Sequence, residues 1–486
     1  MNVSLRVLGP FLFSYPLPSI RFQIVKEKKQ PSGGVFLLMQ LKIDGLFKKK
    51  VTVDFSQENT SSDGGLLLIK TMMDRFEMAE RIKGIVGDDR HPSYIDHSME
   101  SLLAQRLYQL CAGYEDLNDS QALRKDPLLK LVVNESPQSE TDLASASTLG
   151  RLENEVGILG IHGLCELQVE LYLERNRKRW KKAAKHKNLV IRLDMDPTDI
   201  ETYGEQQLAL FHGYYGHRCY LPMVIADGDN GDLITAFLRP GTKHAKFLLV
   251  PILKRLLARI EKEYPFVQFE VRADSGFQCD EVFQFLESKS NISYTLSLAS
   301  NKILERLQSE AVAHLETARK EAEDQKTSFE TQRIFGELGY RAESWSRHRR
   351  VVFQIEANSH RVEIRYLVTN QIEWPAQQVK EHYNQRANIE NRIKELKTQS
   401  FGSRMSCETF EANSFRFQLA CFSLILFQEI KKKLENTPLK NAYVETIRSK
   451  LLKVSVIVSE STRRFILLLP KSYPYPEIWR DLLAPA

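Results

Sequence analysis

Apolar and polar residues follow a helical period over residues 66–165 of this 486-residue chain. Apolar side chains recur every three or four positions in LLLIKTMMDRFEMAERI, MESLLAQRLYQLCAGY and LASASTLGRLENEV, which predicts amphipathic helices. The helical pattern continues over residues 166–187 and ends in the polar run ERNRKRWKKAAKHK. Residues 51–187 are therefore predicted to form a helical region that begins with a short strand and a polar turn.

After residue 187 the pattern changes to short apolar runs rich in β-branched residues, which is typical of strands. Strands are predicted at 188–195, 219–226, 232–238, 267–273 and 292–298. Helices are predicted at 243–264 and 280–288, and the sequence DGDNG at 227–231 predicts a hairpin turn. Strands and helices in this order predict an α/β fold with a sheet of mixed direction.

The remaining chain alternates between the two patterns. Residues 302–326 are charged and helix-prone, residues 333–370 are rich in strand signals, and two long helices are predicted at 375–398 and 408–434. We divide the chain into a core in two parts, 188–300 and 373–436, separated by a β-rich insertion at 301–372. The C-terminal region, 437–486, mixes both signals, and its segment SYPYPEIW is predicted to be a loop.

The net charge of +6 is concentrated in the first tenth of the chain. Residues 1–50 contain nine basic and two acidic residues, so the rest of the chain is close to neutral. The uncharged run 7–20 contains three prolines and is too short for a membrane-spanning helix. We interpret residues 1–50 as a basic leader, of which 1–38 are a mis-started extension with Met39 as the candidate start.

Composition also excludes several classes of protein. The six cysteines form no CxxC pair and no Cys/His spacing typical of a zinc site, which fits a reducing compartment and predicts a cytoplasmic protein. No G-x-x-x-x-G-K-[ST] run occurs, so a P-loop nucleotide hydrolase is excluded. The longest late apolar run, Phe417–Gln428, has only twelve residues and is predicted to be a buried core helix rather than a membrane span.

A basic patch ends the predicted helix at 166–187. Residues 175–187 contain eight basic residues and no acid. One interpretation is a solvated helix end, because cations are favoured near a helix C-terminus. The other is a surface that contacts DNA phosphates, with Trp180 interleaved. Its candidate DNA contacts are Arg177, Lys178, Arg179, Lys181 and Lys182.

Two carboxylates stand where predicted strands end. Asp196 follows the strand at 188–195 in LDMDPTD, and Asp274 follows the strand at 267–273 in VRADSGF. Ligands of open α/β sheets gather at such strand ends, and hard cations such as Mg²⁺ prefer carboxylate oxygens. Asp194 lies on the same strand face as Asp196 and is an alternative ligand. Each carboxylate alone is more often a turn former or a helix cap than a metal ligand.

The predicted helix at 375–398 brings four functional groups together. At about 100° per residue, Tyr383, Arg386, Glu390 and Lys397 share one narrow face. A solvated face with an ordinary Arg386–Glu390 pair at spacing i,i+4 is the simpler interpretation. That interpretation leaves the alignment of Tyr383 and Lys397 with the pair unexplained.

The spacing Y-x(2)-R-x(3)-E-x(6)-K resembles the signature of DDE insertion-sequence transposases of the YREK type. LDMDPTD resembles the first-Asp motif of that family, VRADSGF the second, and YNQRANIENRIKELK the Glu motif. The segments HGYYGHRCYLPMVIADGD and SFRFQLACFSLILF are similar to the group of these transposases numbered 1380. The resemblance spans roughly residues 50–460 and does not include residues 1–38.

The resemblance implies an RNase H-like fold with a catalytic triad of Asp196, Asp274 and Glu390. The triad would bind two Mg²⁺ or Mn²⁺ ions that support in-line phosphoryl transfer. The implied reaction cuts DNA at the element ends and joins the freed 3′-OH ends to target DNA. Asp196 is preferred to Asp194 because the family pattern has Asp, a small residue and then Thr, and Asp199 is a weaker rival.

The same resemblance implies DNA contacts and partners. Tyr383, Arg386 and Lys397 would hold phosphates near the cut. Trp345 would stack on an extruded base, although a packed sheet tryptophan is an equally good interpretation. The region at 51–187 would bind the element ends, and a homodimer would bridge the terminal inverted repeats of double-stranded DNA in the bacterial nucleoid.

Two alternatives to a transposase stay open on the sequence. One is a Mg²⁺-dependent nuclease of the same fold that cleaves without strand transfer. The other is a DNA-binding protein derived from a transposase, against which the intact Asp196, Asp274 and Glu390 argue.

Overall fold

The protein is described here from a computed structural model that divides into two compact units, Met1–Thr60 and Ser61–Ala486. It describes residues 57–242 and 247–484, and before them only the backbone of the strands β1 (Arg21–Ile24), β2 (Lys28–Lys29), β3 (Val35–Phe36), β4 (Met39–Lys42) and β5 (Val51–Val53). β6 (Thr60–Ser61) lies at the boundary between the units. The interpretation of residues 1–38 as a mis-started leader falls mostly outside the described residues and stays a prediction.

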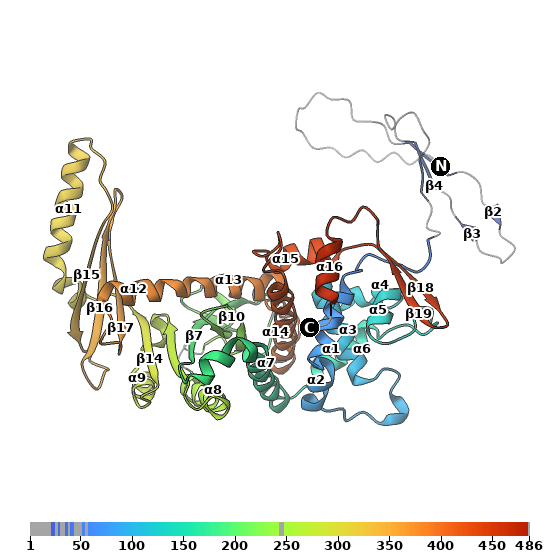
Figure 1. Ribbon diagram of the computed structural model, residues 1–486, viewed down its shortest axis with the longest axis horizontal. Helices are drawn as coiled ribbons and strands as arrows, with labels where there is room; N and C mark the ends of the chain where they lie inside the picture. The colour runs from blue at the N-terminus through green and yellow to red at the C-terminus, as the bar shows by residue number, and fades with distance from the viewer. Residues whose placement is uncertain are drawn as a thin grey trace. The chain divides into compact units, whose positions relative to one another are not determined.

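An eight-stranded mixed sheet forms the centre of the second unit (Figure 1). Its first five strands, in spatial order, are β12 (Leu233–Phe237), β11 (Met223–Asp227), β7 (Val190–Pro197), β13 (Gln268–Ala273) and β14 (Ile292–Leu298). β7, β13 and β14 run parallel to one another. β11 pairs antiparallel with β7, and β12 pairs antiparallel with β11. The predicted α/β fold with a sheet of mixed direction is therefore confirmed.

The two faces of β7 differ in chemistry because successive side chains point to opposite sides of a strand. Ile191, Leu193 and Met195 are buried in a core that also contains side chains of α8 (Leu249–Glu263) and α9 (Asp280–Glu287). The residues between them are charged and lie on the face toward the helical segment that begins with α12. Figure 1 shows α8 and α9 on one side of the sheet and α12 on the other.

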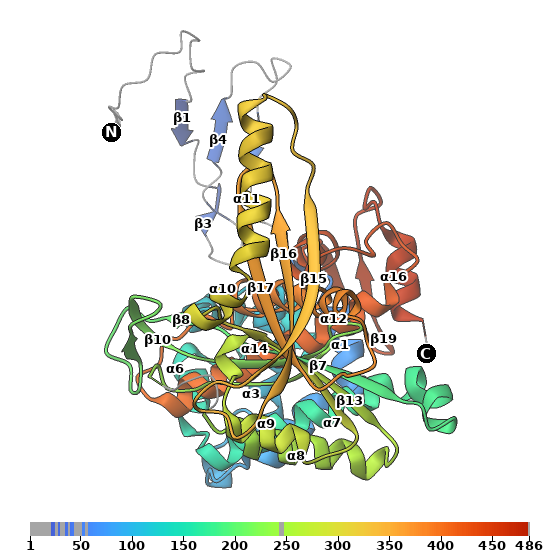
Figure 2. The ribbon, with the colours of Figure 1, turned by 90° about the vertical axis from the view of Figure 1, so that its left-hand side faces the viewer.

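The predicted β-rich insertion continues this sheet instead of forming a separate one (Figure 2). β17 (Val362–Thr369) pairs antiparallel with β14, and β16 (Arg349–Ala357) and β15 (Gln332–Tyr340) follow in order. Two helices, α10 (Lys302–Leu307) and α11 (Ser309–Asp324), precede these strands. The insertion is therefore an extension of the central sheet with a helical portion.

A second, small sheet is inserted in the chain between β7 and β11. It contains β8 (Ile200–Glu201), β10 (His217–Tyr220) and β9 (Leu210–His212), in that spatial order. The strand predicted at 219–226 is therefore wrong as one element. It divides at Leu221 and Pro222 into β10 and β11, because proline cannot donate a ladder hydrogen bond.

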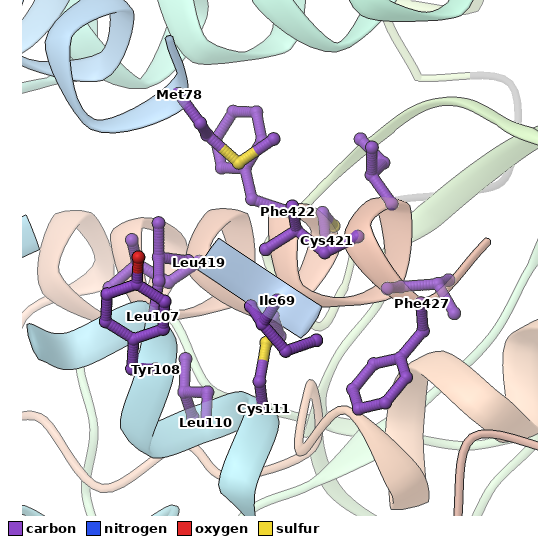
Figure 3. Packing of buried hydrophobic residues seen from close by; sticks show 14 of the residues in the cluster. Ile69, Met78, Leu107, Tyr108, Leu110, Cys111, Leu419, Cys421, Phe422 and Phe427 are labelled. Atoms are coloured by element: carbon purple, nitrogen blue, oxygen red, sulfur yellow. The ribbon is translucent and has the colours of Figure 1, made fainter. Parts of the chain in front are cut away.

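Helices from both ends of the chain share a second hydrophobic core (Figure 3). Ile69, Leu107 and Cys111 come from the first helices, and Phe422 and Phe427 come from α14 (Phe410–Lys433). Phe417–Gln428 is buried, as predicted. The N-terminal elements are α1 (Leu66–Arg75), α2 (Met78–Val86), η1 (Pro92–Tyr94), α3 (Met99–Ala112), η2 (Leu117–Asp119), α4 (Ser120–Leu123), α5 (Pro127–Val132) and α6 (Ala146–Glu155).

The 28-residue helix α7 (Ile158–Lys185) contributes to both cores. Leu164 and Leu167 pack in the helical core, whereas Tyr172 and Trp180 pack under the sheet. Among residues 57–242 and 247–484, no single helix has the length and apolar character to cross a membrane, and one bent pair, α6 with α7, passes by length and composition alone.

The long helix predicted at 375–398 is present but is not uniformly α-helical. It consists of α12 (Ala376–Asn384), a 3₁₀ turn η4 (Gln385–Ala387), α13 (Asn388–Lys394) and a π turn η5 (Glu395–Gln399). The C-terminal elements are α15 (Val444–Ile447), η6 (Arg448–Leu452), β18 (Val456–Ser461), β19 (Arg464–Leu468) and α16 (Pro476–Leu483). The predicted loop SYPYPEIW is therefore wrong in its second half, where Pro476 begins a helix, a position that proline favours.

Candidate active site

Charged side chains of β7 and β13 meet the helix α12 in successive layers. In the first layer, Arg192 of β7 and His382 of α12 both contact Glu270 of β13, at 2.6 and 3.0 Å. In the second, Arg272 donates two hydrogen bonds to Asp194, at 2.6 and 2.9 Å, and one to the carbonyl of His382. Asp194 and Arg272 are both buried, so the carboxylate of Asp194 is used in a structural ion pair. This favours Asp196 over Asp194 as the carboxylate that acts in the site.

Asp196 lies in the third layer, at the end of β7. Its side chain is 17% exposed, and Arg386 Nη2 donates to its Oδ1 at 2.5 Å and to the Met195 carbonyl at 3.1 Å. Burial raises the pKa of Asp196 to about 6 despite the opposing charge of Arg386. The negative charges of Asp274 and Glu390 contribute to this rise, so the three carboxylates act on one another electrostatically.

Asp274 is brought beside Asp196 by the register of two parallel strands. Ala273 of β13 pairs with Met195 of β7, and the next residue on each strand is a candidate carboxylate. Asp274 Oδ1 also accepts the N–H of Gly276 at 2.9 Å and caps the 3₁₀ turn η3 (Ser275–Phe277). Asp274 therefore has the capping role that the simpler interpretation gave it and is also part of the acidic cluster.

Three of the four helix residues contact the ends of these strands. The hydroxyl of Tyr383 donates to the carbonyl of Ala273 at 3.3 Å, and Arg386 contacts Asp196 as described above. Lys397 Nζ lies 3.2 Å from Thr198 Oγ1 and 3.3 Å from Asp199 Oδ1. The three side chains therefore face the strand ends, as the helical spacing predicts.

Glu390 is exposed on α13, one turn after Arg386. Among the described residues, the ion pair of Arg386 is made with Asp196, so the simple i,i+4 pair with Glu390 is not formed. The charge of Glu390 nevertheless helps to raise the pKa of Asp196. The helix thus presents one acid and two cations to the strand ends.

Sequence reasoning missed three further residues at this site. Arg239, which follows β12, is 3% exposed and donates to the Leu221 carbonyl at 2.8 Å. Burial lowers the pKa of Arg239 to about 10, while Tyr215 and Asp274 oppose that shift. Burial raises the pKa of Tyr215 to about 12, and His217 Nε2 lies 3.0 Å from Asp199. The sequence signal for Tyr215 and His217 was the concentration of aromatic residues in HGYYGHRC. Because this segment has no helical or strand period, it predicted no element that would place them.

Trp345 does not have the environment of a base-stacking residue. Its side chain is 5% exposed and packs edge-on against Phe283 and Tyr340, with ring centroids 5.0 and 5.6 Å away. The guanidinium of Arg349 lies 5.4 Å from its ring. The burial of its ring favours the packed tryptophan over a base-stacking residue, and a contact of Trp345 with DNA stays a prediction.

The basic patch on α7 divides into two kinds of residue. Arg177 pairs with Glu263 at 3.1 Å, and Arg179 pairs with Asp227 and Asp229 at 2.8 and 2.9 Å. Trp180 is buried rather than interleaved on the surface. Lys178, Lys181 and Lys182 are exposed, and within the described part of the chain they make no ion pair. These lysines, unlike Arg177 and Arg179, keep the unpaired charge that a phosphate-binding patch needs.

The residues at the strand ends fit a divalent cation in donor type and in charge. Asp196, Asp274 and Glu390 offer the oxygen ligands that hard cations prefer, and their negative charges act on one another at the strand ends. Within residues 57–242 and 247–484, however, no group of three or more His, Cys, Asp or Glu side chains is arranged as a ready set of metal ligands. The guanidinium of Arg386 occupies one carboxylate oxygen of Asp196 instead.

Three comparisons with known proteins were made, and a family model matches nearly the whole chain. A family described as "Transposase DDE domain group 1" matches residues 44–485. A comparison with curated proteins found no match. Among solved structures, a piggyBac transposase synaptic complex with hairpin DNA is similar, with a TM-score of 0.37 and 13% identity over 82% of this chain and 83% of that one.

Proposed function

The chain belongs to the transposase DDE domain group 1 family, and from this premise we propose that it cuts DNA at the ends of an insertion sequence and joins the 3′-OH ends to target DNA. Membership makes the protein a DNA-binding transposase, an enzyme of the polynucleotidyl transferase class. We further propose that it is of the YREK type, group 1380, with an RNase H-like core formed by β12, β11, β7, β13 and β14. The observation that carries the proposal is the convergence of Asp196 and Asp274 at adjacent parallel strand ends beneath the helix of Arg386 and Glu390.

Asp196, Asp274 and Glu390 would hold the metal ions. Two bound Mg²⁺ or Mn²⁺ ions supply activation of the attacking oxygen and neutralisation of the leaving oxygen. The guanidinium of Arg386 lies 2.5 Å from one carboxylate oxygen of Asp196, so a cation held at that oxygen would compete with it. Arg386 would hold a phosphate with two parallel hydrogen bonds, which its planar fork favours.

The neighbouring side chains would position the DNA strand. Lys397 offers a point charge for a phosphate beside Thr198 at the end of β7. Tyr383, fixed on the Ala273 carbonyl, closes the side of the site next to Asp274. The exposed Lys178, Lys181 and Lys182 of α7 would contact DNA phosphates away from the cut. A homodimer that brings two element ends together completes the proposal.

The test uses purified full-length protein and duplex DNA that carries the sequences flanking the gene on both sides. Asp196→Asn, Asp274→Asn and Glu390→Gln should each abolish cleavage and keep binding to the ends, because each removes one carboxylate and leaves the DNA-contacting cations in place. Asp229→Asn is the matched control. It removes one acid from the turn between β11 and β12, where Asp229 pairs with Arg179, and it should keep cleavage. Cleavage that survives any one of the three substitutions removes that residue from the triad.

A second assay separates transposition from simple hydrolysis. Ends that are already cut are mixed with target DNA, and the wild-type protein should produce joined product. Cleavage without any joined product would identify a nuclease of the same fold. Binding without either reaction would identify a DNA-binding derivative.

A further inference from the structure

The small sheet of β8, β10 and β9, of which Figure 2 labels β8 and β10, carries exposed aromatic side chains. Tyr203 is 88% exposed, Tyr214 is 86% exposed and Phe211 is 62% exposed. Among the aromatic residues that the structure describes, only Tyr94 is exposed to the same extent as Tyr203 and Tyr214, and it lies in the N-terminal helical region. Large aromatic rings held in water at one place indicate a contact surface.

A continuous row of contacts joins the tip of this sheet to the end of β7. Tyr214 stands edge-on to Tyr215, with ring centroids 5.0 Å apart, and Tyr215 stacks with His217 at 6.0 Å. His217 contacts Asp199, which also contacts Lys397. Tyr214 is therefore connected, through Tyr215, His217 and Asp199, to Lys397, which would hold a phosphate of the cut strand.

The turn that carries Tyr214 has a defined backbone. The N–H of Gly216 donates to the carbonyl of His212 at 2.8 Å, and Gly216 has a φ of +75°, which glycine adopts without strain. His212 pairs with His217 across the hairpin. Tyr214 is thus presented by a closed turn, and because it is 86% exposed, most of its ring surface is open to solvent.

The exposed rings fit nucleobases better than a protein partner. The strand that would reach Asp196 is a polyanion, and the exposed Arg218 on β10 adds positive charge to the same small sheet. Aromatic rings stack on bases only where those bases are unpaired, because pairing buries base faces in the duplex. The ring of Trp345, in contrast, is buried.

We propose that Tyr214 and Tyr203 stack on unpaired bases of DNA next to the phosphodiester that the enzyme cuts. This inference rests on the proposed function, since it requires a DNA strand at the ends of β7 and β13. It gives the small sheet the task of holding bases while Arg386 and Lys397 hold phosphates.

The experiment measures binding by fluorescence anisotropy with three labelled duplexes: fully paired, interrupted by unpaired thymines, and interrupted by abasic nucleotides. Wild-type protein should prefer unpaired thymines to abasic nucleotides. Tyr214→Ala should weaken binding to the unpaired thymines by between about 5-fold and about 100-fold, the usual range for loss of one stacked base, and leave the other duplexes unaffected. Tyr214→Phe should keep the preference, because the ring rather than the hydroxyl acts.

Phe465→Ala is the control, because it removes an exposed ring from β19, a strand of another sheet that has no proposed DNA contact, and should change nothing. The proposal is overturned if wild-type protein does not distinguish thymines from abasic nucleotides, or if Tyr214→Ala keeps the distinction. A change in oligomeric state without a change in DNA binding would assign the rings to a second copy of the chain and also overturn it. These readouts require no cleavage, so they fail separately from the catalytic test of Asp196, Asp274 and Glu390.

Discussion

We expect the ionised Asp196, at the end of β7, to lower the free energy of unfolding of the metal-free protein. Burial raises the pKa of Asp196 from 3.8 to about 6, which means that the folded protein resists its ionisation. Below the unfolded pKa both states are protonated and the effect is absent. As the pH rises through the folded pKa, stability is lost, and near pH 7 the full cost is present.

The size of the cost follows from the shift. A difference of roughly two pKa units corresponds to about 3 kcal/mol. Because the side chain is 17% exposed and contacts Arg386, we expect a change in unfolding free energy between about 1 and about 3 kcal/mol. Asp196→Asn, which stays neutral and keeps an oxygen acceptor for Arg386, should therefore stabilise the metal-free protein by this amount at about pH 7.5.

The assay is urea unfolding of chelator-treated protein, followed by fluorescence at about pH 4 and about pH 7.5, where the gain should be absent and present respectively. Asp199→Asn is the matched control. Burial alone would raise the pKa of Asp199, but the charge of Lys397 lowers it overall, so this substitution should destabilise the protein near pH 7. If Asp196→Asn also destabilises the protein at pH 7.5, the contact with Arg386 outweighs the cost of burial, and the reasoning is refuted.

Two further outcomes are expected. Trp345→Ala should lower the unfolding free energy by about 3–5 kcal/mol, the usual cost of removing a buried aromatic ring, and leave the DNA affinity of the folded protein unchanged; a selective loss of affinity would restore its predicted contact with DNA. Replacing Lys178, Lys181 and Lys182 together by alanine should make the slope of log affinity against log salt concentration shallower by about 2 to 3, because each phosphate contact contributes about 0.9. Arg177→Ala should change this slope little, because Arg177 is paired with Glu263. Equal changes in slope would contradict the division of the patch.

The sheet and its acids could be predicted because their sequence signals are local. The strand at 188–195 and its neighbours are short apolar runs, and Asp196 and Asp274 stand at their ends in the sequence as in the structure. The shared face of Tyr383, Arg386 and Lys397 also follows from spacing along one helix. The 3₁₀ and π turns within this helix had no signal, since they depend on contacts such as that of buried Glu395 with Arg392 and the N–H of Val444.

Partners that come from distant parts of the chain could not be predicted. Asp194 and Asp196 look alike in LDMDPTD, and only the position of Arg272 on the next strand separates their roles. Trp345 lies among arginines in the sequence, yet Phe283 and Tyr340 cover it in three dimensions. Arg239 and Tyr215 reach the site from loops with no regular pattern.

The helical core shared by α1–α6 and α14 has a consequence for the order of synthesis. A ribosome makes residues 66–155 long before residues 410–433, yet Ile69 and Cys111 find their packing partners on the later segment. The first helices must therefore wait, with apolar faces uncovered, until more than half of the chain has followed. Contacts between such distant segments also slow folding. The proposed end-binding region thus acquires its native packing only after the candidate catalytic residues have been made, and no partial product of translation has the packed region without those residues.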